Sequence, residues 1–246
     1  MSPTGPPPAT PRSPNSPQSV TVILPVYNQA DHIAGLVTSY LAALERVAMD
    51  VELLLVPNGC RDESERICAE LARDNERVRS VPLERGGWGR AVLAGIREAR
   101  AELICYTNSA RTTADVLVLV LLYSTVHPGV VVKANRRVRD SLIRRTGSLL
   151  YNLECRALFD LSVWDVNGTP KVFPRTCAGL LGLRREDDLV DAEFNAVCHR
   201  AGYPVIEVPI LDTTRHSGRS TTNWRSALSL YLGAFRLRRE LDRSDL

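Results

Sequence analysis

Arginine supplies 29 of the 31 basic residues of this chain, and Lys133 and Lys171 are the remaining two. A guanidinium group presents a planar fork of donors that binds a phosphate through two hydrogen bonds. The excess of arginine over lysine therefore indicates either a set of phosphate-binding positions or a compositional bias toward arginine. We expect the bias to explain most arginines and a few motif positions to bind phosphate. The formal net charge of +3 over 246 residues argues against a nucleic-acid-binding protein.

A cluster of glycines is the second feature with chemical potential. Gly86, Gly87 and Gly89 precede and open a predicted helix that runs to Arg100. Glycine allows close approach of the backbone to a ligand, and free amides at a helix start attract an anion. The same composition is also that of an ordinary turn, so the cluster alone does not define a site.

The cysteines and the apolar runs bear on the compartment. The six cysteines, at positions 60, 68, 105, 155, 177 and 198, lack the two-residue spacing of a metal or redox motif. This predicts reduced, buried thiols of a cytosolic protein. No signal-peptide pattern opens the chain, and the longest apolar run, Val116 to Tyr123, is far shorter than the roughly 20 residues of a spanning helix. We expect a cytoplasmic protein, with association at the inner face of the membrane as an open alternative.

The elements that must position these residues begin at Ser19. Seven of the first 18 residues are proline, which predicts a disordered tail over 1–18 and one domain over 19–246. Short apolar runs then alternate with helical runs, which predicts an α/β fold with a mostly parallel sheet flanked by helices. The expected strands are 20–24, 51–56, 78–82 and 103–106.

Helical periodicity marks the connections between these strands. The expected helices are 31–47, 62–74, 87–100, 114–123, one that ends near Phe159, one that begins near Asp191 and one over 224–241. Because ligands bind at the carboxyl ends of parallel strands, we expect the site in the loops that follow those ends. The last helix is basic and amphipathic, so it either packs on its own domain or lies at an anionic membrane surface.

Several loop motifs resemble glycosyltransferase family 2, which has the GT-A fold. Within that family the chain is most similar to the dolichol- and polyprenyl-phosphate sugar synthases, and the likeness covers about 19–240. The motifs that carry it, in order, are VILPVYN at 22–28, VPNGCRDES at 56–64, GGWGRAVLAGI at 86–96, DVNGTPKVFPR at 165–175, DAEF at 191–194, GYPVIEVPI at 202–210 and RHSGRS at 215–220.

The resemblance implies a nucleotide-diphospho-sugar donor. The implied donor-binding residues are Pro25, Tyr27, Asn28, Asn58, Gly87, Asn108, Arg215, Arg219 and Ser220. Packing at a strand end is the simpler reading of Tyr27. The family usually has acidic residues at the positions of Gln29 and Asn58, so the identity of the base stays open.

The largest departure from the family follows the fourth strand. The family holds Mg²⁺ or Mn²⁺ with an Asp-X-Asp motif, but this chain has Asn108 and Ala110 there. Since Mg²⁺ prefers carboxylates or phosphates, we expect no protein ligand set for a metal and name no certain cofactor, and a role for Mg²⁺ or Mn²⁺ stays open. Arg111 is the candidate catalytic cation that stabilises the leaving diphosphate. A solvent-facing Arg111 in a degenerate, inactive relative is the alternative.

The acceptor side is implied by the second half of the motifs. Arg139, Ser141 and Lys171 are the expected ligands of an acceptor phosphate, and Asp165 and Asp191 are the expected catalytic acids. A hydroxyl acceptor needs a general base, for which Asp191 is the candidate, whereas a phosphate acceptor is already an anion. Complementing the helix dipole is the simpler role of Asp191.

The implied function is inverting transfer of a sugar, of the hexosyltransferase type, from a nucleotide-diphosphate donor to polyprenyl phosphate without a required metal. A soluble glycosyltransferase with a small-molecule hydroxyl acceptor is one alternative, and a non-catalytic nucleotide-sugar-binding protein is another. We expect peripheral membrane contact and no nucleic-acid partner.

Overall fold

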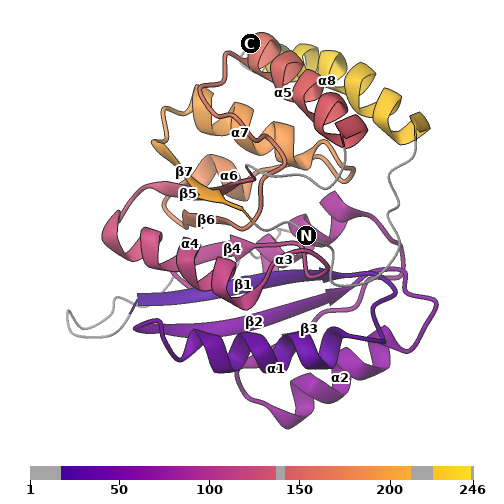
Figure 1. Ribbon diagram of the computed structural model, residues 1–246, viewed down its shortest axis with the longest axis vertical. Coiled ribbons are helices and arrows are strands. Elements are labelled where there is room, and N and C mark those ends of the chain that lie inside the picture. The colour runs from indigo at the N-terminus through magenta and orange to yellow at the C-terminus, as the bar shows by residue number, and fades with distance from the viewer. Residues whose placement is uncertain (1–17, 137–141, 212–223, 245–246) are drawn as a thin grey trace, which may run out of the picture.

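The computed structural model describes residues 18–136, 142–211 and 224–244 (Figure 1). The predicted tail, 1–18, therefore lies outside the described residues except for Gln18. No helix within these ranges is long and apolar enough to cross a membrane.

A seven-stranded sheet runs through the centre of the molecule in the order β3-β2-β1-β4-β6-β5-β7. In its first half, β1 (Gln18–Val26), β2 (Met49–Pro57), β3 (Val78–Ser80) and β4 (Leu103–Tyr106) are parallel. β1 and β2 are β-branched and leucine-rich, and their central residues are buried on both faces, as a covered parallel strand requires. The four predicted strands are therefore present, and their carboxyl ends share one edge.

The second half of the sheet contains the exception to the parallel arrangement. β5 (Val131–Arg136) and β7 (Val205–Ile210) are parallel to each other, while β6 (Lys171–Pro174) runs antiparallel to both β4 and β5. The sheet is thus mostly parallel, as predicted, with one reversed strand. Since β6 reverses the direction twice across its two neighbours, the carboxyl end of β5 lies at the same edge as those of β1 and β4.

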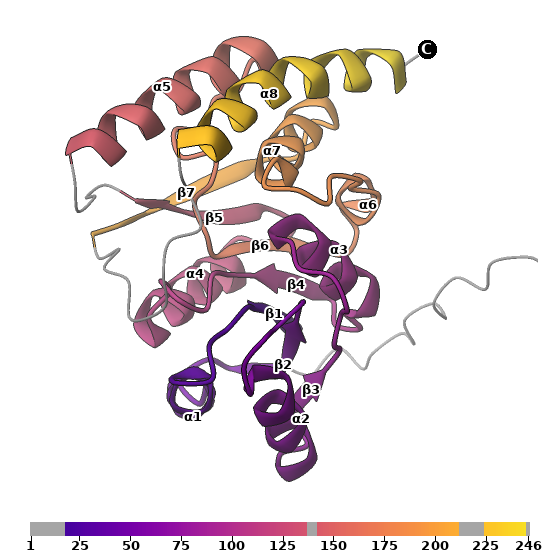
Figure 2. The ribbon, with the colours of Figure 1, turned by 90° about the vertical axis from the view of Figure 1, so that its right-hand side faces the viewer.

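Helices cover both faces of the sheet and add an outer layer (Figure 2). One face packs on α1 (Ile33–Leu44), α2 (Ser64–Asp74) and α4 (Ala114–Val126). The other packs on α3 (Trp88–Glu98), α6 (Ala178–Leu181) and α7 (Val190–Arg200). α5 (Leu142–Phe159) and α8 (Trp224–Ser244) lie side by side over α7 and share a third apolar cluster with it.

The third apolar cluster shows that the last helix packs on its own domain, which is one of the two alternatives predicted for it. Ala234 and Leu237 of α8 are buried against α5 and α7, so the helix does pack on its own domain. Leu232 and Phe235 remain about half exposed on its other side. The packing therefore uses one face of α8 and leaves the opposite face uncovered by the described residues.

Candidate active site

Asn58 joins the loops that follow β1 and β2 to the glycine-rich turn. Its side chain is 3% exposed, and its Nδ2 donates to the carbonyls of Val26 and Val56 at 2.8 and 3.1 Å. Its Oδ1 accepts from the Gly87 N–H at 3.0 Å. Because these backbone groups engage both polar atoms, Asn58 acts here as a brace within the protein. The predicted contact of Asn58 with a nucleotide base stays a prediction.

The glycines of this region are required by close backbone packing. Gly59 has φ of 61°, and a Cβ there would lie 2.4 Å from the Gly86 nitrogen. A Cβ on Gly89 would lie 2.3 Å from the Asp187 carbonyl oxygen. The glycine-rich turn is thus pressed against the loop after β2 on one side and against 185–187 on the other. This packing accounts for two of the glycines without a ligand.

The tyrosine and asparagine after β1 border the same turn. The ring of Tyr27 faces Gly86 and is 41% exposed, so it lies at the surface of the candidate donor side. Asn28 has φ of 49° and accepts the Arg61 N–H on its Oδ1 at 2.8 Å. The exposed ring of Tyr27 is available to stack on a planar ligand, whereas Asn28 shapes the loop.

The loop after β4 is a tight turn held to the loop after β1. Asn108 Oδ1 accepts from the Ala110 N–H at 3.0 Å, and its carbonyl accepts from the Arg111 N–H at 3.0 Å. Ser109 Oγ donates to Gln29 Oε1, at 2.7 Å, or to the Pro25 carbonyl, at 2.9 Å. The side chains of Ser109 and Gln29 are buried, and Arg111 is partly exposed at the end of the turn.

Asp191 lies at the centre of a second group of side chains, in the first turn of α7. Its Oδ1 accepts from the Tyr106 hydroxyl at 2.9 Å and from the Lys171 ammonium. Its Oδ2 accepts from Trp88 Nε1 at 3.0 Å. The carboxylate is therefore hydrogen-bonded by groups from β4, β6 and the start of α3, and Asp191 is only 5% exposed.

Burial has strong electrostatic effects on the partners of Asp191. It raises the pKa of Tyr106 well above its usual value, and the neighbouring Asp191 carboxylate adds to the effect. It lowers the pKa of Lys171 to about 8, against the opposing attraction of Asp191. The rings of Tyr106 and Phe194 flank the Lys171 ammonium, with centroids at 5.3 and 5.1 Å. Lys171 is thus a fully buried cation paired with Asp191, and its predicted contact with an acceptor phosphate stays a prediction.

Lys133 occupies the strand position beside Lys171 and has its own acidic partners. The two lysines are paired in register across β5 and β6, and both are fully buried. Lys133 Nζ donates to the Asp165 carbonyl and lies 3.4 Å from Glu207 Oε1. Desolvation lowers the pKa of Lys133, while the nearby carboxylates oppose this shift.

Asp165, a predicted catalytic acid, holds an arginine at the end of β5. Its carboxylate accepts from the Arg136 backbone N–H at 3.0 Å and from the guanidinium at 2.7 and 2.8 Å. The side chain of Asp165 is 3% exposed. Two hydrogen bonds to one guanidinium in a buried position fix both partners. Asp165 therefore positions Arg136 in this structure and is not turned to the surface.

Glu207 ties this group to the segment before the acceptor-side motif. Its carboxylate accepts from the backbone N–H groups of Trp164 and Asp165 at 2.8 and 3.0 Å, and from Asn135. The described part of the molecule thus contains a cluster of three cations and three carboxylates. We call it the buried charge cluster, and its members are Lys133, Arg136, Lys171, Asp165, Asp191 and Glu207.

Sequence reasoning found part of this cluster and missed the rest. The rarity of lysine drew attention to Lys171, and the motifs gave Asp165 and Asp191, whereas Lys133 was given no role. Glu207, Trp88 and Tyr106 were not proposed as site residues, although each lies in or beside a quoted motif or strand end. The predicted Arg139, Ser141, Arg215, Arg219 and Ser220 lie outside the described residues.

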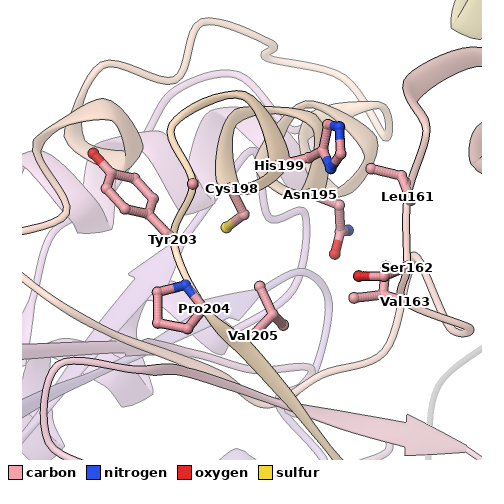
Figure 3. Close-up of a pocket in the computed structure, with 10 residues that line it drawn as sticks. Leu161, Ser162, Val163, Asn195, Cys198, His199, Tyr203, Pro204 and Val205 are labelled. Carbon is pink, nitrogen blue, oxygen red and sulfur yellow. The ribbon is translucent and has the colours of Figure 1, made fainter.

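A separate cavity of about 250 Å³ lies beside the carboxyl-terminal half of α7 (Figure 3). Its lining includes Asn195, Cys198 and Val205, and Val205 begins β7. The candidate site follows the carboxyl ends of the parallel strands, so this cavity is at the opposite edge of the sheet. It does not belong to the site described above.

Comparison with known proteins finds a family match over part of the chain. Residues 21–117 match the family described as Glycosyl transferase family 2. The undecaprenyl-phosphate 4-deoxy-4-formamido-L-arabinose transferase of Pectobacterium atrosepticum is 25% identical over 219 residues, 87% of this chain and 65% of that protein. The protein of the same description from Photorhabdus laumondii is 30% identical over 139 residues, 55% of this chain and 42% of that protein. The match places residues 21–117 in glycosyltransferase family 2. The chain spans 65% or less of the length of these two relatives.

Solved structures of two sugar-phosphoglycerate synthases share the fold of this chain. Glucosyl-3-phosphoglycerate synthase from Mycobacterium tuberculosis, in complex with Mn²⁺, UDP and phosphoglyceric acid, superposes with a TM-score of 0.66. The match has 18% identity and covers 90% of this chain and 78% of that one. Mannosyl-3-phosphoglycerate synthase from Rubrobacter xylanophilus gives 0.62, with 19% identity and coverage of 94% and 76%. The predicted GT-A fold is confirmed.

The residues at the family's metal position do not fit a divalent cation in this chain. Asn108 Oδ1 already accepts a backbone hydrogen bond, and Ala110 is a buried apolar side chain. Within the described ranges, no three His, Cys, Asp or Glu side chains are grouped as a metal site requires. A single neutral oxygen is a poor ligand for Mg²⁺ or Mn²⁺. The Mn²⁺ of the mycobacterial structure is a property of that protein.

Proposed function

We propose that this chain acts as a family 2 glycosyltransferase of the hexosyltransferase type, which transfers a sugar with inversion from a nucleotide-diphosphate donor to a polyprenyl phosphate. The curated relatives named for transfer to undecaprenyl phosphate support this acceptor class. The transfer breaks the bond between the sugar carbon and the diphosphate, and an acceptor phosphate oxygen forms the new bond. The nucleoside diphosphate leaves with the electron pair.

The burial and hydrogen bonding of the Asp191 carboxylate support a phosphate acceptor over a hydroxyl acceptor. A hydroxyl acceptor must lose a proton during attack, which requires a base in contact with solvent or substrate. Asp191, the predicted base, is 5% exposed and accepts hydrogen bonds from Lys171, Tyr106 and Trp88. A phosphate acceptor is already an anion and needs alignment instead of deprotonation. The geometry therefore favours a phosphate acceptor.

Arginine replaces the metal in our proposal for the leaving group. The loop after β4 lacks carboxylates but presents Arg111 at the end of its turn. A fixed cation beside the departing diphosphate stabilises the charge that develops in the transition state. Arg215, Arg219 and Ser220 are proposed as further diphosphate ligands, on the strength of their motif. Arg139 and Ser141 are proposed as ligands of the acceptor phosphate on the same ground.

Transfer to undecaprenyl phosphate in excess chelator tests the proposal. A panel of radiolabelled nucleotide sugars supplies the donor, and the anomeric configuration of the product tests inversion. We expect transfer without added metal, a loss of about 10²-fold or more in Arg111→Ala, and partial activity in Arg111→Lys. Strict dependence on Mg²⁺ or Mn²⁺ would contradict the role of Arg111. Transfer to a small hydroxyl acceptor but not to undecaprenyl phosphate would contradict the proposed acceptor class. Binding of a nucleotide sugar without turnover would contradict the proposal that the protein is an enzyme.

A further inference from the structure

The outer layer of the molecule has an exposed apolar face on two helices. Leu149, Leu150 and Leu153 of α5 are about half exposed, and so are Leu232 and Phe235 of α8. On α5 the exposed positions recur with helical spacing of three and four residues, opposite Tyr151 and Cys155, which are buried. The exposed leucines therefore form one stripe that points away from the core.

The stripe on α8 has the same geometry and lies beside that of α5. Leu232, Phe235, Arg236, Arg239 and Arg243 are all exposed and fall on one side of the helix, opposite Ala234 and Leu237. The Tyr231 hydroxyl donates to the Gly147 carbonyl, and Arg238 donates to the Leu158 carbonyl. These contacts show that the helices run parallel, with Leu149–Leu153 at the level of Leu232–Phe235 (Figure 2).

The exposed charges on the α8 side of this surface are mainly positive. No ion pair of Arg236, Arg239 or Arg243 is found among the described residues. The acids of α8 are engaged elsewhere on the protein, since Glu240 pairs with Arg185 and Asp242 pairs with Arg200 and Arg238. Glu154 is the acid that α5 contributes beside the leucines, and burial raises its pKa. Apolar side chains beside uncompensated arginines are the composition of a helix that lies on an anionic lipid surface.

We propose that this surface docks the protein on an anionic membrane. We call it the α5–α8 outer face, and it consists of Leu149, Leu150, Leu153, Leu232, Phe235, Arg236, Arg239 and Arg243. The apolar side chains enter the boundary between headgroups and acyl chains, while the arginines contact lipid phosphates.

Segments proposed for the phosphate sites adjoin both helices in the sequence. Residues 139 and 141, proposed for the acceptor phosphate, precede α5, and residues 215–220, proposed for the donor diphosphate, precede α8. The apolar side chains of the face lie near the middle of each helix, and the arginines lie further along α8. The inference rests on the proposed function for the identity of the acceptor, because polyprenyl phosphate is held in a bilayer. The binding of lipid itself does not depend on turnover.

A second apolar stripe elsewhere provides a matched control. Leu119, Leu122, Tyr123 and Val126 of α4 are also exposed, with spacing of three and four residues. No Lys or Arg occurs in the sequence of α4. Substitution of Leu122 and Val126 by serine removes a comparable apolar area from a stripe that lacks basic residues.

Flotation of the full chain with lipid vesicles, without substrates, tests the proposal. We expect binding to vesicles of phosphatidylglycerol and phosphatidylcholine, weaker binding to phosphatidylcholine alone, and weakening by salt. Leu150→Ser with Phe235→Ser should reduce binding by tenfold or more. Arg236→Gln, Arg239→Gln and Arg243→Gln together should reduce binding to the anionic vesicles by about a hundredfold, at about fivefold per arginine. The α4 variant should bind as the unmodified protein does.

Three results would overturn the docking proposal. They are no binding to anionic vesicles, equal losses in the α4 and α5–α8 variants, and a dimer in sedimentation velocity that the α5–α8 variants convert to monomer. The last result would assign the face to a second copy of the chain. Transfer to a short, water-soluble polyprenyl phosphate separates this outcome from failure of the proposed function. Vesicle binding without such transfer would contradict the function alone, and transfer without vesicle binding would contradict the docking alone.

Discussion

Two buried lysines in an arginine-rich chain show how residue type follows from environment. Lys133 and Lys171 lie side by side inside the sheet, where a compact ammonium at the end of a flexible stem reaches Asp165, Glu207 and Asp191. The rarity of lysine indicates that position 171 is not interchangeable with arginine, and the structure shows that Lys133 is equally buried. Their partners could not be predicted, because Asp191 is 20 residues from Lys171 and Glu207 is 74 residues from Lys133 in sequence.

The lowered pKa of Lys171 predicts a pH-dependent contribution to stability. Burial lowers this pKa from 10.5 to about 8 in the folded protein. Between these values the unfolded chain binds the proton and the folded protein does not, so this group's contribution to the unfolding free energy rises with pH. The unfolding free energy of the unmodified protein minus that of Lys171→Met, both measured by urea unfolding, should therefore increase by about 3 kcal/mol from pH 8 to 10.5.

An exposed ion pair supplies the control for this experiment. Arg46 pairs with Asp115 and is 54% exposed, so Arg46→Met should show a small difference that does not change over the same range. A difference for Lys171→Met that stays constant with pH would contradict the assignment of the titrating group.

Asn58 gives a second prediction at this scale. Asn58→Asp restores the carboxylate usual in the family, but it replaces a donor that faces the Val26 and Val56 carbonyls. The buried charge then lies against two acceptors, so we expect a loss of about 2–3 kcal/mol in unfolding free energy. Asn108→Asp is the control, because its Oδ1 accepts one backbone hydrogen bond and its side chain is less buried. Equal stability of the two variants would contradict the brace role of Asn58.

At the scale of elements, the sequence predicted the first half of the sheet better than the second. β4 was expected at 103–106 and lies there, because a short, fully buried apolar run between turns has few alternatives. β6 was not predicted as a strand, since it has four residues, begins with lysine and ends with proline. The burial of Lys171 in β6 depends on its partner Asp191, which α7 contributes. The local sequence around β6 does not contain this partner.

The contact between the glycine-rich turn and the segment at 185–187 predicts a sensitive position. Gly89→Ala places a Cβ 2.3 Å from the Asp187 carbonyl oxygen, so α3 or that segment must shift. We expect a loss of 2 kcal/mol or more in stability, on the order of an overpacked core, together with weaker binding of the donor. Gly35→Ala in α1 has no neighbour within 4 Å and should stabilise the protein by about 0.5–1 kcal/mol. Thermal unfolding and donor titration check both, and an unaffected Gly89→Ala would contradict the packing role.

At the scale of the whole molecule, the chain has a GT-A fold, and its residues 21–117 match glycosyltransferase family 2. We propose that residues 19–246 form one domain, since β5 and β7 join the same sheet as β1 and β4. Removal of residues 1–17 should then leave the midpoint of thermal unfolding within about 2 °C, because β1 begins at Gln18. A drop of 5 °C or more would show that the first residues contribute to the domain.

The central claim is that Asp191 anchors the buried charge cluster and does not act as a base, so that the acceptor is a phosphate. The most direct measurement is the rate of transfer to undecaprenyl phosphate by Asp191→Asn, with the folded fraction matched by circular dichroism. Asparagine keeps an acceptor for Lys171 and Tyr106 but cannot take a proton. The account predicts a rate within about tenfold of the unmodified protein. A loss of about 10²–10⁴-fold, the contribution typical of general base catalysis, would contradict it.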